Sequence, residues 1–235
     1  MRQKAVLFDL DETLTDRQAS LIRAGKRLYD TYGVISKKIT LEQVLDTIKS
    51  IETEACKKGL FASRRMIAEE LLDRLDWESK PSSKQLEEFW EVQYPISVKP
   101  ECDLKRLVAK INGMGYSTGV VTNGPCEYQK AKIKALKIDI LMDMYVISEE
   151  VGVAKPCVDI FHMALKTLGV DPSNAWFIGD NPYSDIQGAK NAGMVSVWKN
   201  NGRKWPSAYT PPDFIISSIT EIVDLLYQSN KEATD

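Results

Sequence analysis

The stretch AVLFDLDETLT, residues 5–15, decides the fold of this 235-residue chain. It begins as an apolar run and ends in two carboxylates, Asp9 and Asp11. A short apolar run bounded by polar residues is typical of a strand buried on both faces, as in a parallel sheet. Ligands of open α/β sheets bind outside the carboxyl ends of the strands, so both aspartates are placed for chemistry. One could act as a nucleophile and the other as an acid/base, and together they could attract a hard cation. The alternative is a strand that runs into an ordinary acidic turn.

Composition and charge exclude several classes of protein. The chain is 43% hydrophobic and 27% charged, and its net charge of −2 gives no reason to expect nucleic acid or an anionic membrane as partner. No apolar stretch approaches the roughly 20 residues that span a bilayer, and no signal peptide is visible, so we expect a cytoplasmic protein. The single histidine, His162, is expected to be structural. The cysteines lack zinc-site spacing and are expected to be free thiols in a reducing cytosol: Cys56, Cys102, Cys126 and Cys157.

After the first strand, residues 16–95 show apolar positions at helical spacing and no strand pattern. Gly33 ends the first predicted helix, and Thr40 and Gln43 form a capping-box pattern at the start of the second. Pro95 and Pro100 are expected to mark the end of the fourth. We therefore expect an all-helical domain over 16–95, inserted into a core formed by 1–15 and 96–235.

From residue 103 onward, strands alternate with helices of about ten residues. This pattern predicts parallel βαβ units and a doubly wound α/β sheet. The predicted strands are residues 117–122, 143–148, 174–180, 194–198 and 213–216.

Polar motifs follow three of these later strands. Thr122, Asn123 and Gly124 place a hydroxyl, an amide and a glycine where a helix begins, which suits an oxyanion or phosphate, although an ordinary helix cap has the same composition. Lys155 precedes a helix that starts with proline, and could bind phosphate or be a solvated loop residue.

The last motif is acidic. Asp180 ends a buried strand and Asp185 follows five residues later, where it could also be a first-turn helix acid. Carboxylates of this kind suit Mg²⁺. Together, the strand ends predict a phosphate and magnesium site with four carboxylates, one lysine and one hydroxyl, built without histidine.

With these motifs in this order, the sequence resembles the haloacid dehalogenase superfamily of phosphohydrolases over nearly its whole length. Residues 9–13 resemble its first motif, 121–124 its second, 155–156 its third and 179–185 its fourth. The helical insertion resembles the subclass with a helical cap between the first and second motifs. The resemblance implies a Rossmann-like core with such a cap.

The resemblance also implies a role for each site residue. Asp9 is similar to the nucleophile that forms an aspartyl-phosphate, and Asp11 to the general acid/base, whose backbone carbonyl would also bind Mg²⁺. The phosphate would be held by Thr122 and Lys155, within the loop that includes Asn123 and Gly124. The remaining metal residues would be Asp180 and Asp185.

Asp11 favours phosphate chemistry within the superfamily, because its dehalogenases lack this second aspartate. We expect a Mg²⁺-dependent phosphatase acting on a small phosphomonoester of the nucleotide or sugar phosphate type. A phosphosugar mutase keeps the same motif and stays an alternative. A catalytically idle protein that binds a phosphate ligand is the third possibility, although a binder has no need for Asp11.

Overall fold

The computed structural model describes residues 2–34, 38–57 and 63–232. Its contacts divide the chain into two compact units. The first, here called the core unit, comprises Met1–Asp16 and Pro100–Asp235, and the second, the helical unit, comprises Arg17–Lys99. Among the described residues, no helix is both long and apolar enough to cross a membrane.

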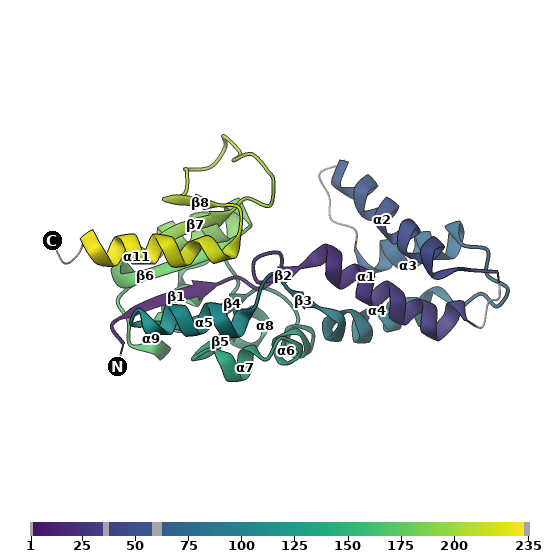
Figure 1. Cartoon of the computed structure of the whole chain (residues 1–235), viewed down its shortest axis with the longest axis horizontal. Coiled ribbons are helices and arrows are strands. Elements are labelled where there is room, and N and C mark those ends of the chain that lie inside the picture. The colour runs from purple at the N-terminus through teal and green to yellow at the C-terminus, as the bar shows by residue number, and fades with distance from the viewer. Residues whose placement is uncertain (1, 35–37, 58–62, 233–235) are drawn as a thin grey trace. The chain divides into compact units, whose positions relative to one another are not determined.

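The core unit is built on a six-stranded parallel sheet (Figure 1), as the sequence predicts. Its strands are β1 (Lys4–Phe8), β4 (Tyr116–Thr122), β5 (Met144–Ile147), β6 (Ala175–Gly179), β7 (Val195–Lys199) and β8 (Phe214–Ile216). They lie in the order β5-β4-β1-β6-β7-β8, so the chain runs outward from β1 in both directions. Such a change of direction is where open α/β sheets bind ligands.

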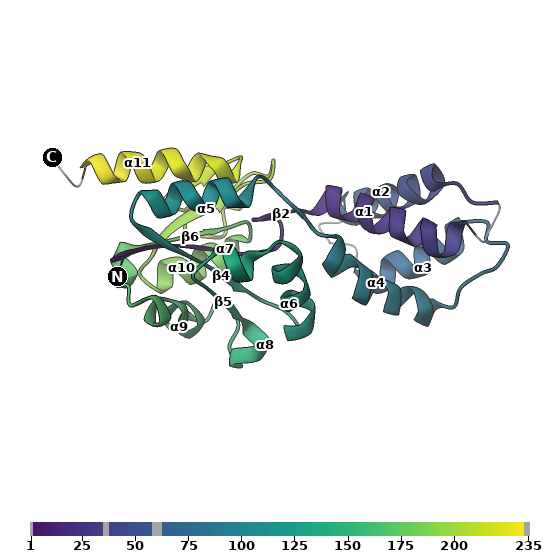
Figure 2. The ribbon, with the colours of Figure 1, turned by 60° about the horizontal axis from the view of Figure 1, so that its bottom comes forward.

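Helices cover both faces of this sheet. They are α5 (Leu104–Gly113), α6 (Cys126–Ala135), α7 (Ile138–Leu141), α8 (Ser148–Val151), α9 (Val158–Leu168), α10 (Gly188–Asn191) and α11 (Ile222–Glu232), with a π-helix η3 (Pro182–Gln187) and 3₁₀ turns η2 (Pro172–Asn174) and η4 (Ile219–Glu221). Figure 2 shows α5 and α11 on one face and α9 and α10 on the other. The fold is therefore doubly wound.

The sheet is buried because its strands are apolar on both faces. Residues 5–8 of β1 are completely buried. On one face, β1 and β6 pack against α9, where the rings of Phe161 and Phe177 meet edge to face with centroids 4.9 Å apart. An edge-to-face pair of this kind adds to the energy of burial.

The strand register brings the motifs together. Phe8 lies opposite Val120 of β4 and Ile178 of β6. Thr122 and Asp180 each follow two residues later, at the edge where Asp9 leaves β1. The Asp9 N–H donates to the carbonyl oxygen of Ile178 at 2.8 Å and extends the ladder by one residue.

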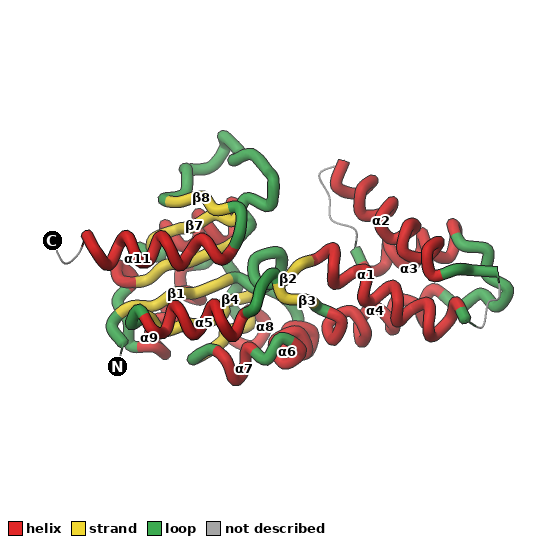
Figure 3. The backbone as a smooth tube through the Cα atoms, viewed as in Figure 1, coloured by secondary structure: helices red, strands yellow, loops and turns green. Residues whose placement is uncertain are grey.

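The helical unit consists of α1 (Arg17–Leu28), a π-helix η1 (Tyr29–Gly33), α2 (Leu41–Lys57), α3 (Arg64–Arg74) and α4 (Ser83–Ser97). Figure 3 shows these elements as helices joined by loops. Thr40 and Gln43 form the predicted capping box, with reciprocal hydrogen bonds of 2.8 and 3.2 Å at the start of α2. Two short strands, β2 (Thr15–Asp16) and β3 (Lys99–Pro100), form a separate two-stranded sheet.

The fourth helix ends between Pro95 and Pro100, the two prolines expected to mark its end. Pro95 lies inside α4, which continues to Ser97. Proline removes one backbone donor, but near the end of a helix this loss is small beside the gain from packing. Pro95 is buried, and the Ser97 hydroxyl donates to the carbonyl oxygen of Gln93 at 2.6 Å.

Candidate active site

Three buried carboxylates meet at the carboxyl edge of the sheet. Asp9 follows β1, Asp180 follows β6 and Asp185 lies in η3. Each offers an oxygen within 4.8 Å of the others. A site whose ligand atoms are all oxygens suits a hard cation, so these residues fit a divalent metal ion of the magnesium type.

The turn between β6 and η3 brings Asp185 close to the backbone. A Cβ at Gly179 would lie 2.3 Å from the Asp185 Cβ, so this position requires glycine. Asp185 Oδ2 accepts a hydrogen bond of 2.9 Å from the Asn181 N–H. The Asn181 side chain in turn caps η3 by accepting from the N–H groups of Tyr183 and Ser184. The local sequence thus fixes where Asp185 points.

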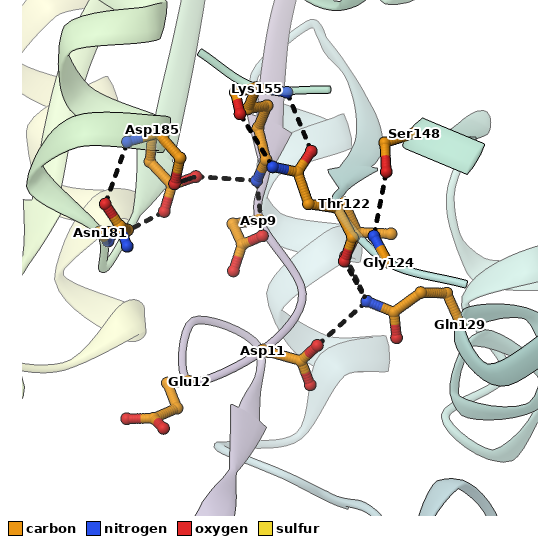
Figure 4. Close-up of polar contacts among 12 residues, drawn as sticks. Asp9, Asp11, Glu12, Thr122, Gly124, Gln129, Ser148, Lys155, Asn181 and Asp185 are labelled. Carbon is orange, nitrogen blue, oxygen red and sulfur yellow. Dashed lines mark hydrogen bonds and ion pairs between the residues drawn. The ribbon is translucent and has the colours of Figure 1, made fainter. Parts of the chain in front are cut away.

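Lys155 lies between two of the carboxylates, as Figure 4 shows. Its Nζ lies 2.6 Å from Asp9 Oδ1 and 2.8 Å from Asp185 Oδ1, and its side chain is 1% exposed. The Asn123 amide holds the Lys155 backbone through two hydrogen bonds of 2.9 Å, one in each direction. Burial acts to lower the pKa of Lys155, but the two carboxylates outweigh it and raise that pKa above its ordinary value. Lys155 is therefore a fixed cation.

Even so, the carboxylates outnumber the positive charges around them. Burial raises the pKa of Asp9 well above its ordinary value, against the opposing effect of Lys155. Burial and the charge of Asp185 raise the pKa of Asp180 to about 7, although Arg203 Nη2 lies 2.7 Å from Asp180 Oδ2 and acts to lower it. A cation among these oxygens would relieve both effects.

The loop after β4 is held by hydrogen bonds. Gly124 adopts φ = 141°, a conformation that favours glycine, and its N–H donates to Ser148 Oγ at 3.0 Å. The Thr122 hydroxyl oxygen accepts from Gln129 Nε2 at 2.8 Å. Phosphate binding by Asn123 and Gly124 stays a prediction, since their described contacts are to Lys155, Ser148 and Gln129.

Asp11 lies apart from the three-carboxylate group. Its oxygens accept from Lys132 Nζ at 2.7 and 2.8 Å and from Gln129 Nε2 at 3.1 Å. The Asp11 side chain is 43% exposed, and Figure 4 shows it directed toward Gln129. The next residue, Glu12, has φ = 60°, and its carbonyl oxygen accepts from Asn201 Nδ2 at 2.9 Å.

Sequence reasoning missed the residues that complete these contacts, namely Gln129, Lys132, Asn201 and Arg203. The contacts of Arg203 and Asn201 are long-range and leave no local pattern. Gln129 and Lys132 did leave a signal, because they stand three residues apart on the buried face of α6, where apolar residues are expected.

The remaining candidates lie outside this chemistry. A ring nitrogen of His162 lies 3.2 Å from the carbonyl oxygen of Ala192, which is consistent with the predicted structural role. Cys102, Cys126 and Cys157 are free thiols, as predicted. The side chain of Cys56 lies outside the described part of the structure.

Comparison with known proteins finds relatives over most of the chain. A glyceraldehyde 3-phosphate phosphatase of Pyrococcus abyssi (strain GE5 / Orsay) is 36% identical over 227 residues, covering 95% of this chain and 92% of that protein. A phosphoserine phosphatase of Thermus thermophilus is 28% identical over 172 residues, covering 73% and 68%. The putative HAD-hydrolase YfnB from Bacillus subtilis, solved bound to magnesium, shares the fold with a TM-score of 0.68 at 20% identity, covering 96% of this chain and 99% of that one.

The family itself follows from a match to a family model. The family model described as haloacid dehalogenase-like hydrolase matches residues 6–199, which contain all four motifs. This match confirms the resemblance seen in the sequence. The chain belongs to the haloacid dehalogenase-like hydrolases.

Proposed function

We propose that this protein is a Mg²⁺-dependent phosphatase that hydrolyses a small phosphomonoester through an aspartyl-phosphate on Asp9. The observation that carries the proposal is the position of Asp9, whose Oδ1 lies 2.6 Å from Lys155 Nζ within the three-carboxylate group. Relatives named as phosphatases of glyceraldehyde 3-phosphate and of phosphoserine support a small phosphate substrate. We propose a substrate of the nucleotide or sugar phosphate type.

In the first step, an Asp9 oxygen attacks phosphorus and the bond from phosphorus to the alcohol oxygen breaks. Asp11, protonated at this stage, gives its proton to the departing oxygen, so the alcohol leaves neutral. The Lys155 ammonium and the Thr122 hydroxyl bind phosphoryl oxygens. Their role is electrostatic, because an anionic carboxylate must approach an anionic phosphate.

In the second step, water attacks the phosphorus of the aspartyl-phosphate and Asp11 takes the water proton. The bond from phosphorus to Asp9 breaks, inorganic phosphate leaves, and Asp9 is again a carboxylate. Asp11 is then protonated again, because a proton from the water replaces the one that left with the alcohol. The sum is one water consumed for each ester cleaved.

The residues that would hold Mg²⁺ are Asp9, Asp180 and Asp185, with the Asp11 backbone carbonyl. Their oxygen atoms fit a hard cation and their charge needs one. Mg²⁺, when bound, offsets the charge of the phosphoryl oxygens and of Asp9. We propose further that the helical unit is a cap that selects the substrate, and that the enzyme acts in the cytoplasm on a small molecule, with no nucleic acid polymer or membrane as partner.

The test is phosphate release from a panel of esters, with Mg²⁺ or with a chelator. The panel contains glyceraldehyde 3-phosphate, phosphoserine, nucleoside monophosphates, sugar phosphates and a chromogenic aryl phosphate. We expect Mg²⁺-dependent release, lost in Asp9→Asn. Acid quenching of enzyme mixed with radiolabelled substrate should trap a phosphoryl-enzyme, absent in the variant.

Two outcomes would contradict the proposal. Phosphoryl transfer from one sugar phosphate to another without free phosphate would indicate a mutase. Tight binding of phosphate without turnover, by folded protein in Mg²⁺, would indicate a binding protein.

A further inference from the structure

We propose that Gln129 and Lys132 are positioning residues that hold the Asp11 carboxylate, and that Gln129 also connects it to Thr122. This inference rests on the proposed function. Neither residue belongs to the four motifs, and both lie on the buried face of α6. Gln129 contacts both the residue proposed to bind phosphate and the residue proposed to move protons, and Lys132 contacts the latter.

Lys132 fixes Asp11 by charge. Its Nζ lies within 2.8 Å of both Asp11 oxygens, and its side chain is 5% exposed. The ring of Tyr128 lies beneath the ammonium, with its centroid 4.6 Å from Nζ. The Tyr128 ring and the buried aliphatic part of the Lys132 side chain leave the ammonium few positions. The ammonium therefore confines the Asp11 carboxylate that it contacts.

Gln129 connects Asp11 to Thr122 through one nitrogen. Its Nε2 donates to Thr122 Oγ1 at 2.8 Å, to the Asn123 carbonyl oxygen at 2.8 Å and to Asp11 at 3.1 Å (Figure 4). The amide cannot be reversed, because the Asn123 carbonyl oxygen only accepts and an ionised Asp11 does the same. Gln129 Oε1 is buried without a hydrogen-bond partner among the described residues. In this orientation the amide nitrogen makes its hydrogen bonds, while the amide oxygen makes none to the described residues.

This geometry has two consequences for the reaction. Since Thr122 Oγ1 accepts from Gln129, the hydroxyl hydrogen is left to point elsewhere, as donation to a phosphoryl oxygen requires. Gln129 Nε2 also has only two hydrogens for its three acceptors, and its contact with Asp11 is the longest of the three. A Thr122 hydroxyl that donates to phosphate becomes a better acceptor, which draws Gln129 from Asp11. Occupation of the phosphate site thus weakens the contact between Gln129 and Asp11.

The experiment compares two esters in one set of variants. An alkyl phosphate needs its leaving oxygen protonated, whereas an aryl phosphate with an acidic phenol hardly does. We measure kcat/KM for both, because this parameter reports the steps up to release of the alcohol. The variants are Lys132→Met, Lys132→Arg and Gln129→Met. The control is Lys130→Met on the exposed face of α6, where Lys130 pairs with Glu150.

A positioning role predicts a change in the ratio of the two kcat/KM values, alkyl ester to aryl ester. Lys132→Met should lower kcat/KM for the alkyl ester by about 10²-fold and for the aryl ester by less than about 10-fold, since only the former depends on general acid catalysis. Lys132→Arg should bring this ratio part of the way back to the wild-type value. Lys130→Met should change kcat/KM for neither ester. Gln129→Met should shift the ratio in the same direction, which keeps the test valid if Lys132→Met does not fold.

A double variant adds a second readout. If Lys132 acts only through Asp11, Lys132→Met combined with Asp11→Asn should be no slower than Asp11→Asn alone. Losses that multiply, or equal losses on both esters, would overturn the inference and leave the proposed function standing. A wild-type protein that releases phosphate from neither ester would overturn the proposed function, and this inference with it.

Discussion

Lys155 is the residue on which the charge balance of the site depends. One buried ammonium contacts Asp9 and Asp185, and Asp180 adds a third negative charge to the same group. A buried charge without a partner is far more costly than an exposed one. Both the proposed reaction and the stability of this edge of the sheet therefore depend on Lys155.

Replacing Lys155 should destabilise the protein beyond the loss of an ordinary ion pair. We expect Lys155→Met to lower the free energy of unfolding by about 3–5 kcal/mol, because two buried carboxylates lose their partner. The control is Lys190→Met, whose half-exposed pair with Asp213 should contribute about 0–1 kcal/mol. Urea unfolding in a chelator measures both. Similar losses in the free energy of unfolding for Lys155→Met and Lys190→Met would refute the role of Lys155 in balancing the buried carboxylates.

Asp180 makes metal binding depend on pH. Its pKa is raised to about 7, so in the metal-free protein its contribution to stability is complete below the ordinary value of 3.8 and is lost as the pH rises toward 7. A cation needs the ionised carboxylate. We expect Mg²⁺ to raise the Tm more at about pH 8 than at about pH 5.5. Thermal melts with Mg²⁺ or chelator measure this, and equal shifts at both pH values would contradict it.

The turn from β6 into η3 is the element with the tightest geometry in the site. The strand ends beside Asp185, and because Gly179 has no side chain, the Asp185 side chain can lie against it. The position of the Asp185 carboxylate thus depends on the glycine at 179 as well as on its own residue type.

A methyl group at Gly179 tests this element. Gly179→Ala would place Cβ 2.3–2.5 Å from Asp185 atoms, so we expect a loss of about 1–3 kcal/mol in stability and about 10²-fold in activity. Gly113→Ala is the control, because a Cβ at that position in α5 meets nothing within 4 Å. It should be neutral or stabilise by up to about 1 kcal/mol. Denaturation curves and phosphate release measure both, and a fully active Gly179→Ala enzyme would be the contrary result.

At the scale of the whole molecule, the core unit consists of two pieces of chain separated by the helical unit. The first piece supplies β1, an interior strand of the sheet, and therefore part of the core itself. The Glu101 N–H donates to the Leu14 carbonyl oxygen at 2.9 Å, so within this unit the two pieces meet where they are interrupted.

Removing the helical unit should leave a folded core. A chain in which Asp16 is joined to Pro100 by a short glycine and serine linker keeps the sheet, the carboxylates and Lys155. We expect one cooperative unfolding transition and a Tm still raised by Mg²⁺. Discrimination among alkyl phosphates should be lost, since we propose that the helical unit selects the substrate. Melting curves and relative kcat/KM values measure this, and a shortened chain that kept its preference would refute that role.

Much of this architecture could be predicted because it depends on local patterns. Apolar runs predict the parallel strands, and each strand end carries its polar motif in adjacent residues. The two prolines bracket the end of α4 but do not give its last residue, because packing lets the helix continue past Pro95 to Ser97. The contacts of Arg203 with Asp180, and of Lys132 with Asp11, join residues far apart in the chain, and no local pattern reports such distances.

The sequence by itself determined the α/β class, the helical insertion and the residue types of the site. It did so because strand periodicity, helix caps and motif spacing are short-range properties of a chain. The tertiary structure alone decided which charges meet. It placed Asp11 on Lys132 and Gln129 instead of beside Asp9, and it turned two polar residues of α6 inward. Those choices follow from the register of the sheet and the packing of α6, which exist only once the chain has folded.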